Sequence, residues 1–266
     1  MPLNRTLAFA LALGLGATGA IAQDLRIGLQ EDPDVLDPDQ SRTFVGRIVY
    51  ASLCDKLVDI TPDLEIIPML ATDWTWSEDG LELTMNLREG VTFHDGEPFN
   101  AAAVVANIDR SQNMDESRRK SEVKSITKAE AVGDMTVKFT LAAPDATLIA
   151  QFADRAGMMM SPKAAAEAGA DFGLMPICSG PFKFKERIQQ DRIVLEKFDA
   201  YYNADQINFD TVTFLPIPDT TVRLANLRAG DLDMLERLAA TDLRRSSPTP
   251  TCRSHRRLRW AIRALR

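Results

Sequence analysis

Histidine is scarce in this chain of 266 residues, which has only two, His94 and His255. Histidine is the commonest metal ligand and the side chain that most often transfers protons in catalysis. Because His255 lies in an unusual basic segment near the end of the chain, only His94 is left for such roles. One histidine cannot build a metal site with several His ligands.

The motifs of common enzymes are also missing. The chain has no Gly-rich phosphate loop, no Ser in a nucleophile elbow and no HExxH zinc motif. With these motifs missing, no catalytic residue, metal or cofactor is assigned from the sequence. Carboxylates are abundant, so an exported hydrolase that uses a pair of them stays open as an alternative.

The one usable histidine lies in the stretch FHDG, residues 93–96. The pair His94 and Asp95 could orient a proton for catalysis. However, Asp95 and Gly96 favour a tight turn between a strand that ends at Phe93 and a helix that begins after Asn100. We therefore interpret His94 as a structural residue that bonds backbone groups at this corner.

The first 22 residues have the layout of a cleavable signal peptide. They combine Arg5, an apolar run from Leu7 and the small-x-small site Ala20-Ile21-Ala22. The run is too short and too rich in Gly and Ala to span a membrane stably, and no Cys follows the predicted cut. We expect a periplasmic protein with no lipid anchor and no later membrane span.

Only three cysteines are present, Cys54, Cys178 and Cys252. In an oxidising compartment, Cys54 and Cys178 could form a disulfide. They could equally be two buried thiols, and the long spacing leaves both interpretations open.

Acidic residues are absent from residues 244–266, which hold eight Arg. The rest of the chain carries 38 acidic side chains against 23 basic ones. This acidic body argues against nucleic acid or anionic lipid as a partner. The basic end is either a genuine basic arm or an out-of-frame translation. We favour the second interpretation on composition. One choice of codons for Ala-Asp-Pro-Asp-Leu, read one nucleotide later, also gives the Pro-Thr-Pro-Thr-Cys of residues 248–252.

Periodic hydrophobicity predicts a mixture of strands and helices. Residues 25–29 and 81–87 are expected to be strands, and residues 44–57, with an apolar side chain every fourth position, a helix. Asn100 and Asp219 are expected to cap two further helices. The predicted hairpins are residues 126–141 and 182–198. Because hairpins interrupt any regular alternation of strand and helix, the predicted class is α/β with an inserted antiparallel subdomain.

A long stretch of the chain resembles a known family. The segment MLATDWTWSEDGLELTMNLREGVTFHDGEPFNAAAVV, residues 69–105, resembles the signature region of the family 5 extracellular solute-binding proteins. These are the dipeptide-, oligopeptide-, glutathione- and nickel-type binding proteins of ABC importers. The resemblance continues through CSGPFKFKER and TTVRLANLRAGDLDML and covers about residues 24–243. Family members usually carry Thr-Gly-Pro-Tyr where this chain has Ser179-Gly180-Pro181-Phe182.

The resemblance implies a periplasmic-binding-protein-like clamp of type II, with a subdomain inserted into its first lobe. The first lobe would be incomplete and the second lobe missing, because relatives are about twice as long. The expected parts are a signal peptide (1–22), lobe one (23–58 and 176–243), the inserted subdomain (59–175) and the basic tail (244–266). Ligand would bind between two lobes that close about a hinge.

The function implied by the resemblance is delivery of a small-molecule ligand, most often a peptide, by a monomer to an ABC permease in the inner membrane. The present chain is expected to be a truncated form in which ligand binding is impaired. Glutathione, a nickel chelate, an opine or a sugar are alternative ligands. Glu31, Asp32, Thr43 and Ser179 are the candidate ligand-binding residues, although each can also be a solvated loop residue. The pair 118–119, both Arg, could bind a carboxylate, but we interpret it as a solvated face.

Overall fold

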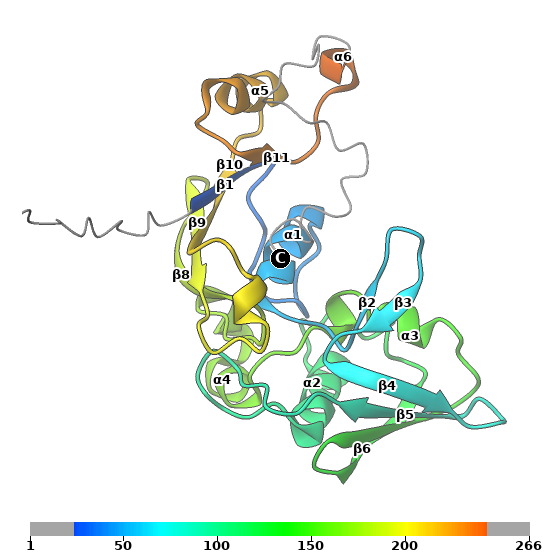
Figure 1. Cartoon of the computed structure of the whole chain (residues 1–266). Coiled ribbons are helices and arrows are strands. Elements are labelled where there is room, and N and C mark those ends of the chain that lie inside the picture. The colour runs from blue at the N-terminus through cyan, green and yellow to red at the C-terminus, as the bar shows by residue number, and fades with distance from the viewer. Residues whose placement is uncertain (1–23, 244–266) are drawn as a thin grey trace, which may run out of the picture.

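The computed structural model describes residues 24–243, which form two packed units with separate hydrophobic cores (Figure 1). The first unit is built on a five-stranded sheet with the strand order β11-β1-β10-β9-β8. Its strands are β1 (Asp24–Leu29), β8 (Phe182–Ile188), β9 (Arg192–Lys197), β10 (Thr211–Pro216) and β11 (Met234–Leu235). The strands β1, β10 and β11 run parallel, whereas β9 and β8 form an antiparallel hairpin.

This unit also contains helices. They are α1 (Phe44–Leu53), α4 (Pro162–Ala168) and α5 (Thr220–Ala229), with the short α6 (Ala240–Leu243) at the end of the described residues. α1 packs against β8, and α5 packs against β11. As predicted, Asp219 caps α5 by accepting hydrogen bonds from two backbone N–H groups, and Gly230 ends the helix with a left-handed φ of 84°.

The predicted helix over residues 44–57 is one turn too long. α1 ends at Leu53 because Cys54 adopts an extended backbone, with φ −124° and ψ 115°. An apolar side chain recurs at every fourth position up to Leu57, but Leu57 packs in the core of the other unit. Leu57 therefore continues the sequence pattern of the helix although it lies outside the helix.

The second unit is an antiparallel sheet with the strand order β4-β5-β7-β6, covered by α2 (Ala101–Asn113) (Figure 1). Its strands are β4 (Ala71–Trp76), β5 (Glu82–Leu87), β6 (Ile126–Gly133) and β7 (Thr136–Leu141), with the small hairpin β2 (Val58–Ile60) and β3 (Ile66–Pro68) and the short α3 (Leu148–Gln151) beside them. The predicted hairpin over residues 126–141 is confirmed. Asn100 caps α2 by accepting a hydrogen bond from Ala103 N.

Residues 160–175 were predicted to belong to the inserted subdomain, but their buried side chains pack in the core of the first unit. Met158 and Met160 pack in the core of the first unit and Met159 packs in the core of the other, so the chain crosses between the units here, and Met160 pairs with Cys178 in an isolated bridge. Met160, Ala165 and Phe172 are all buried in the core of the five-stranded sheet. By core packing, the inserted unit therefore spans about residues 57–159 and not 59–175.

The predicted signal peptide and basic tail lie outside the described residues. Between residues 24 and 243, no helix is long and apolar enough to cross a membrane.

Candidate ligand-binding site

Three parallel strands end side by side at one edge of the five-stranded sheet. In their register, Leu29 of β1 pairs with Pro216 of β10, and Gly28 pairs with Leu235 of β11. We call the residues that follow these strands the carboxyl edge: residues 30–32, 217–219 and 236–237. In open α/β sheets, ligands bind outside the carboxyl ends of parallel strands, so this edge is the candidate site.

The carboxyl edge carries charged side chains of both signs. Glu31 and Arg237 are exposed. Glu236 is only 5% exposed; its carboxylate accepts a hydrogen bond of 3.3 Å from Gln30 N and lies 3.3 Å from Arg237 Nε. Burial raises the pKa of Glu236. The edge can therefore meet a ligand with both a carboxylate and a guanidinium.

An aromatic ring at the start of α1 lies beside these charges. Phe44 is 43% exposed, and the guanidinium carbon of Arg237 is 5.8 Å from the centroid of its ring. Arg47, one turn along α1, lies at the same distance from the ring. Phe44 therefore supplies an apolar surface next to the carboxyl edge.

Of the four candidate residues chosen from the sequence, Asp32 has a structural partner at this edge. Its carboxylate accepts hydrogen bonds of 3.0 Å from Arg187 Nη2 and from Gln190 N. Arg187 lies in β8 and Gln190 in the turn that follows, so Asp32 ties the chain leaving β1 to the β8–β9 hairpin.

The two candidate hydroxyl groups also serve the fold. Thr43 is the N-cap of α1: its Oγ1 accepts from Gly46 N and donates to Asp34. Ser179 is fully buried and donates to the carbonyl of Met159 at 3.2 Å. Glu31 is therefore the only one of the four candidates whose side chain is exposed at the carboxyl edge.

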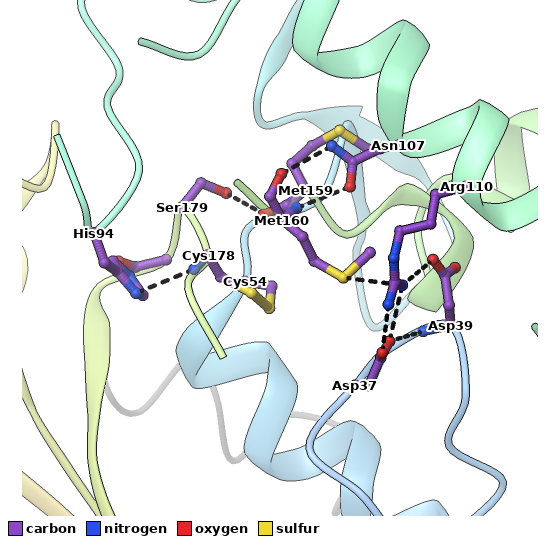
Figure 2. The surroundings of a disulfide bond; sticks show 11 residues. Asp37, Asp39, Cys54, His94, Asn107, Arg110, Met159, Met160, Cys178 and Ser179 are labelled. Atoms are coloured by element: carbon purple, nitrogen blue, oxygen red, sulfur yellow. Dashed lines mark hydrogen bonds and ion pairs between the residues drawn. A yellow bond between two sulfur atoms is a disulfide. The ribbon is translucent and has the colours of Figure 1, made fainter. Parts of the chain in front are cut away.

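A disulfide within the first unit lies beside a histidine of the inserted unit (Figure 2). Cys54 and Cys178 are bonded to each other. His94, in the turn of the inserted unit, accepts a hydrogen bond from Cys178 N at Nδ1 and contacts the Gly180 carbonyl through Nε2 at 3.0 Å. These contacts require a neutral ring with its proton on Nε2, and burial lowers the pKa of His94 to about 4. The interpretation of His94 as a structural corner is confirmed.

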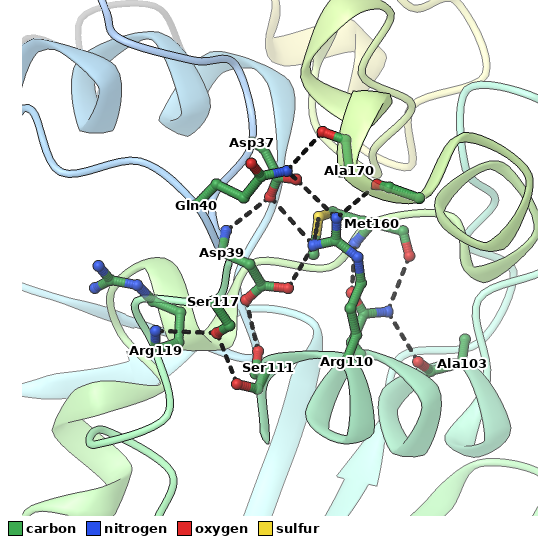
Figure 3. A network of polar contacts seen from close by, with 12 residues as sticks. Asp37, Asp39, Gln40, Ala103, Arg110, Ser111, Ser117, Arg119, Met160 and Ala170 are labelled. Carbon is green, nitrogen blue, oxygen red and sulfur yellow. Dashed lines mark hydrogen bonds and ion pairs between the residues drawn. The ribbon is translucent and has the colours of Figure 1, made fainter. Parts of the chain in front are cut away.

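A buried polar network holds the loop between β1 and α1 against the inserted unit (Figure 3). Arg110 of α2 pairs with Asp37 at 2.7 Å and with Asp39 at 2.6 Å, and both aspartates are almost fully buried. Ser111 donates to Asp39 at 2.6 Å. Burial raises the pKa of Asp39, although Arg110 opposes this shift. The loop that carries Glu31 is therefore fixed at its far end.

The interpretation of residues 118–119 as a solvated face is right for one of the two and wrong for the other. Arg118 is exposed, but Arg119 is only 5% exposed. Arg119 pairs with Glu122 and donates to the carbonyl of Ser41 at 3.2 Å. Its guanidinium is buried because it supports the same loop that Arg110 holds.

The chain matches a known protein family over most of its length. The model of the family described as "Bacterial extracellular solute-binding proteins, family 5 Middle" matches residues 65–252, which is more than half of the chain. The chain belongs to this family.

Two similar proteins illustrate the range of the family. The glutathione-binding protein GsiB of Pectobacterium atrosepticum is 36% identical over 211 residues, which cover 79% of this chain and 41% of GsiB. The structure of AgaA from A. tumefaciens R10 in complex with agropinic acid is 29% identical, with a TM-score of 0.78 over 85% of this chain and 46% of AgaA. The chain thus spans less than half the length of these relatives.

The family assignment confirms the predicted class, α/β and periplasmic-binding-protein-like. The solved MppA, described as a periplasmic murein tripeptide binding protein in its unliganded open form, supports the same fold, with a TM-score of 0.77 at 24% identity. These relatives are described as binding glutathione, agropinic acid and murein tripeptide. In the described part of this chain, no group of three or more His, Cys, Asp and Glu side chains could hold a metal ion.

Several residues of the site were missed by the sequence interpretation. Glu236 and Arg237 follow β11, a strand of two residues that no hydrophobic pattern marks. Phe44 was identified only as the start of a helix. The position of Glu236 and Arg237 beside the end of β1 depends on parallel pairing between segments about 200 residues apart, which leaves no local pattern in the sequence.

Proposed function

We propose that this chain forms the first lobe of a receptor that delivers solute to an ABC permease in the inner membrane. The proposed solute is a peptide, bound without chemical change by a monomer. Residues 1–22 would direct export of the receptor to the periplasm and would then be cleaved off, and the receptor would carry no lipid anchor. No nucleic acid takes part.

The observation that carries this proposal is the charge arrangement at the carboxyl edge. Glu31 and Arg237 are both exposed there, on segments that leave neighbouring parallel strands. A peptide has a cationic amino end and an anionic carboxyl end, so it can pair with both side chains. The exposed ring of Phe44 suits an apolar peptide side chain. Glutathione and opines are also charged at several groups and stay as alternatives, as the names of the relatives suggest.

The test is an NMR titration of the chain with a dipeptide, glutathione, an opine, a nickel chelate and a sugar. Because one lobe provides only part of the contacts, weak binding is expected, with a Kd on the order of 1 mM, or about −4 kcal/mol. The dipeptide should shift the amide resonances of the carboxyl edge and leave those of β4–β7 unchanged.

Two variants test whether the peptide response depends on the carboxyl edge. Glu31→Gln should weaken the peptide response, whereas Glu89→Gln, at an exposed site beyond β5, should not. Shifts confined to the inserted unit, or no shifts with any solute, would contradict the proposal. Appearance of free amino acids from the dipeptide would instead support the alternative of an exported hydrolase.

A further inference from the structure

One arginine reaches the carboxyl ends of all three parallel strands. Arg223 lies in the first turn of α5 and is only 3% exposed. One nitrogen of its guanidinium, Nη1, donates to the carbonyls of Ile217 and Pro218, which follow β10. The other, Nη2, donates to the carbonyl of Arg237, which follows β11, at 3.2 Å.

The aliphatic part of the same side chain lies on the third strand. A Cβ atom placed on Gly28 of β1 would be 3.5 Å from Cδ and 3.7 Å from Cγ of Arg223. The same atom would be only 2.6 Å from the side chain of Leu232. A glycine at position 28 therefore lets α5 and the segment after it approach β1 closely.

The backbone at one of the bonded carbonyls is strained. Arg237 has a φ of 58°, in the left-handed region that residues with a Cβ adopt infrequently. Such a conformation persists where the surrounding structure holds it in place. The hydrogen bond from Arg223 is one of these restraints, because it fixes the carbonyl that follows the strained φ.

We propose that Arg223 is a positioning residue for ligand binding: it sets the relative positions of the segments that leave β10 and β11. This inference rests on the proposed function. The chain segments that it bonds belong to the carboxyl edge and include Arg237 itself. A binding edge fixed in advance loses less conformational entropy when the ligand arrives, so its affinity is higher.

The planar fork of arginine is required for this role. Its two terminal nitrogens reach carbonyls on two different segments at once, whereas lysine offers one compact ammonium group. Arg223→Lys keeps the positive charge and most of the aliphatic chain that packs against Gly28. It cannot donate to carbonyls on both segments at once. Arg228→Lys is the matched control, because Arg228 is on the same helix and exposed.

The test is amide hydrogen exchange of the ligand-free chain, with the dipeptide titration run on the same samples. The informative amides are those of Ile217, bonded to the Leu29 carbonyl, and Glu236, bonded to the Gly28 carbonyl. Loss of one charge-assisted hydrogen bond should speed their exchange by about tenfold in Arg223→Lys. Amides of β5 and β7 should be unchanged, and Arg228→Lys should match the wild type throughout. The peptide affinity of Arg223→Lys should fall by a similar factor.

Three results would overturn the inference. Unchanged exchange at Ile217 and Glu236 would show that the fork is not needed. Equal acceleration of all slow amides would show a general loss of stability. Faster exchange at the edge with unchanged peptide affinity would separate Arg223 from binding. If the wild type shows no peptide response, the proposed function fails, while the exchange data still report whether Arg223 holds the edge.

Discussion

The disulfide between Cys54 and Cys178 should be one of the largest single contributions to the stability of the chain. Both sulfur atoms are buried in the core of the five-stranded sheet, at the end of α1 and beside the His94 corner. The covalent loop that they close contains the whole inserted unit. Replacing both cysteines with alanine removes this constraint and places a small apolar side chain at each of the two buried positions.

The size of the effect follows from the length of the loop. The two cysteines are 124 residues apart in the sequence. The chain-entropy relation for a crosslinked unfolded chain then gives a stabilisation of about 5 kcal/mol at 25 °C. The free energy of unfolding of Cys54→Ala/Cys178→Ala should be lower by roughly that amount.

The assay is urea unfolding followed by circular dichroism, without reductant. Both proteins should carry Cys252→Ser so that no third thiol can exchange with the disulfide. The parent protein measured in excess reductant is the matched control, and its midpoint should move in the same direction. A decrease smaller than about 1 kcal/mol would refute the reasoning, because it would mean that the unfolded chain gains little freedom when the loop opens.

Two further predictions concern buried ionisable side chains. Arg110→Met leaves Asp37 and Asp39 buried without their cation, which should lower the free energy of unfolding by about 3–5 kcal/mol in the same urea assay; a loss under 1 kcal/mol would contradict this. His94 has a pKa of about 4 in the folded state against an ordinary value of 6.5, so the unfolded chain binds more protons between these values. Its contribution to stability is therefore present above pH 6.5 and is lost towards pH 4, by up to about 1.4 kcal/mol per pH unit. His94→Gln should flatten this part of a pH series of unfolding midpoints, and an unchanged slope would exclude the role of His94.

The parts of the fold that were predicted from the sequence depend on contacts between near neighbours. Asn100 and Asp219 cap their helices through backbone N–H groups two or three residues away. The hairpins of β6–β7 and β8–β9 follow from alternating hydrophobic residues around a short turn. Such patterns are complete within a short window of sequence, so they can be read without the tertiary structure.

The parts that were missed depend on contacts between distant residues. Arg110 is more than 70 residues from Asp37 and Asp39, and no periodicity connects them. The resemblance to the family indicated that residues 31–32 lie near a ligand. It could not indicate that the Asp32 carboxylate is engaged by Arg187, because that pairing spans 155 residues.

The most direct test of the central claim is photo-crosslinking with a dipeptide that carries a photoreactive group, followed by mapping of the labelled residues by mass spectrometry. Crosslinking captures weak complexes, so it suits a single lobe. The account predicts labels at residues 30–32, 217–219 and 236–237, with Phe44 beside them, and competition by unlabelled dipeptide. Labels at the opposite edge of the sheet, near Asp24 and Thr211, or on the inserted unit would contradict the account.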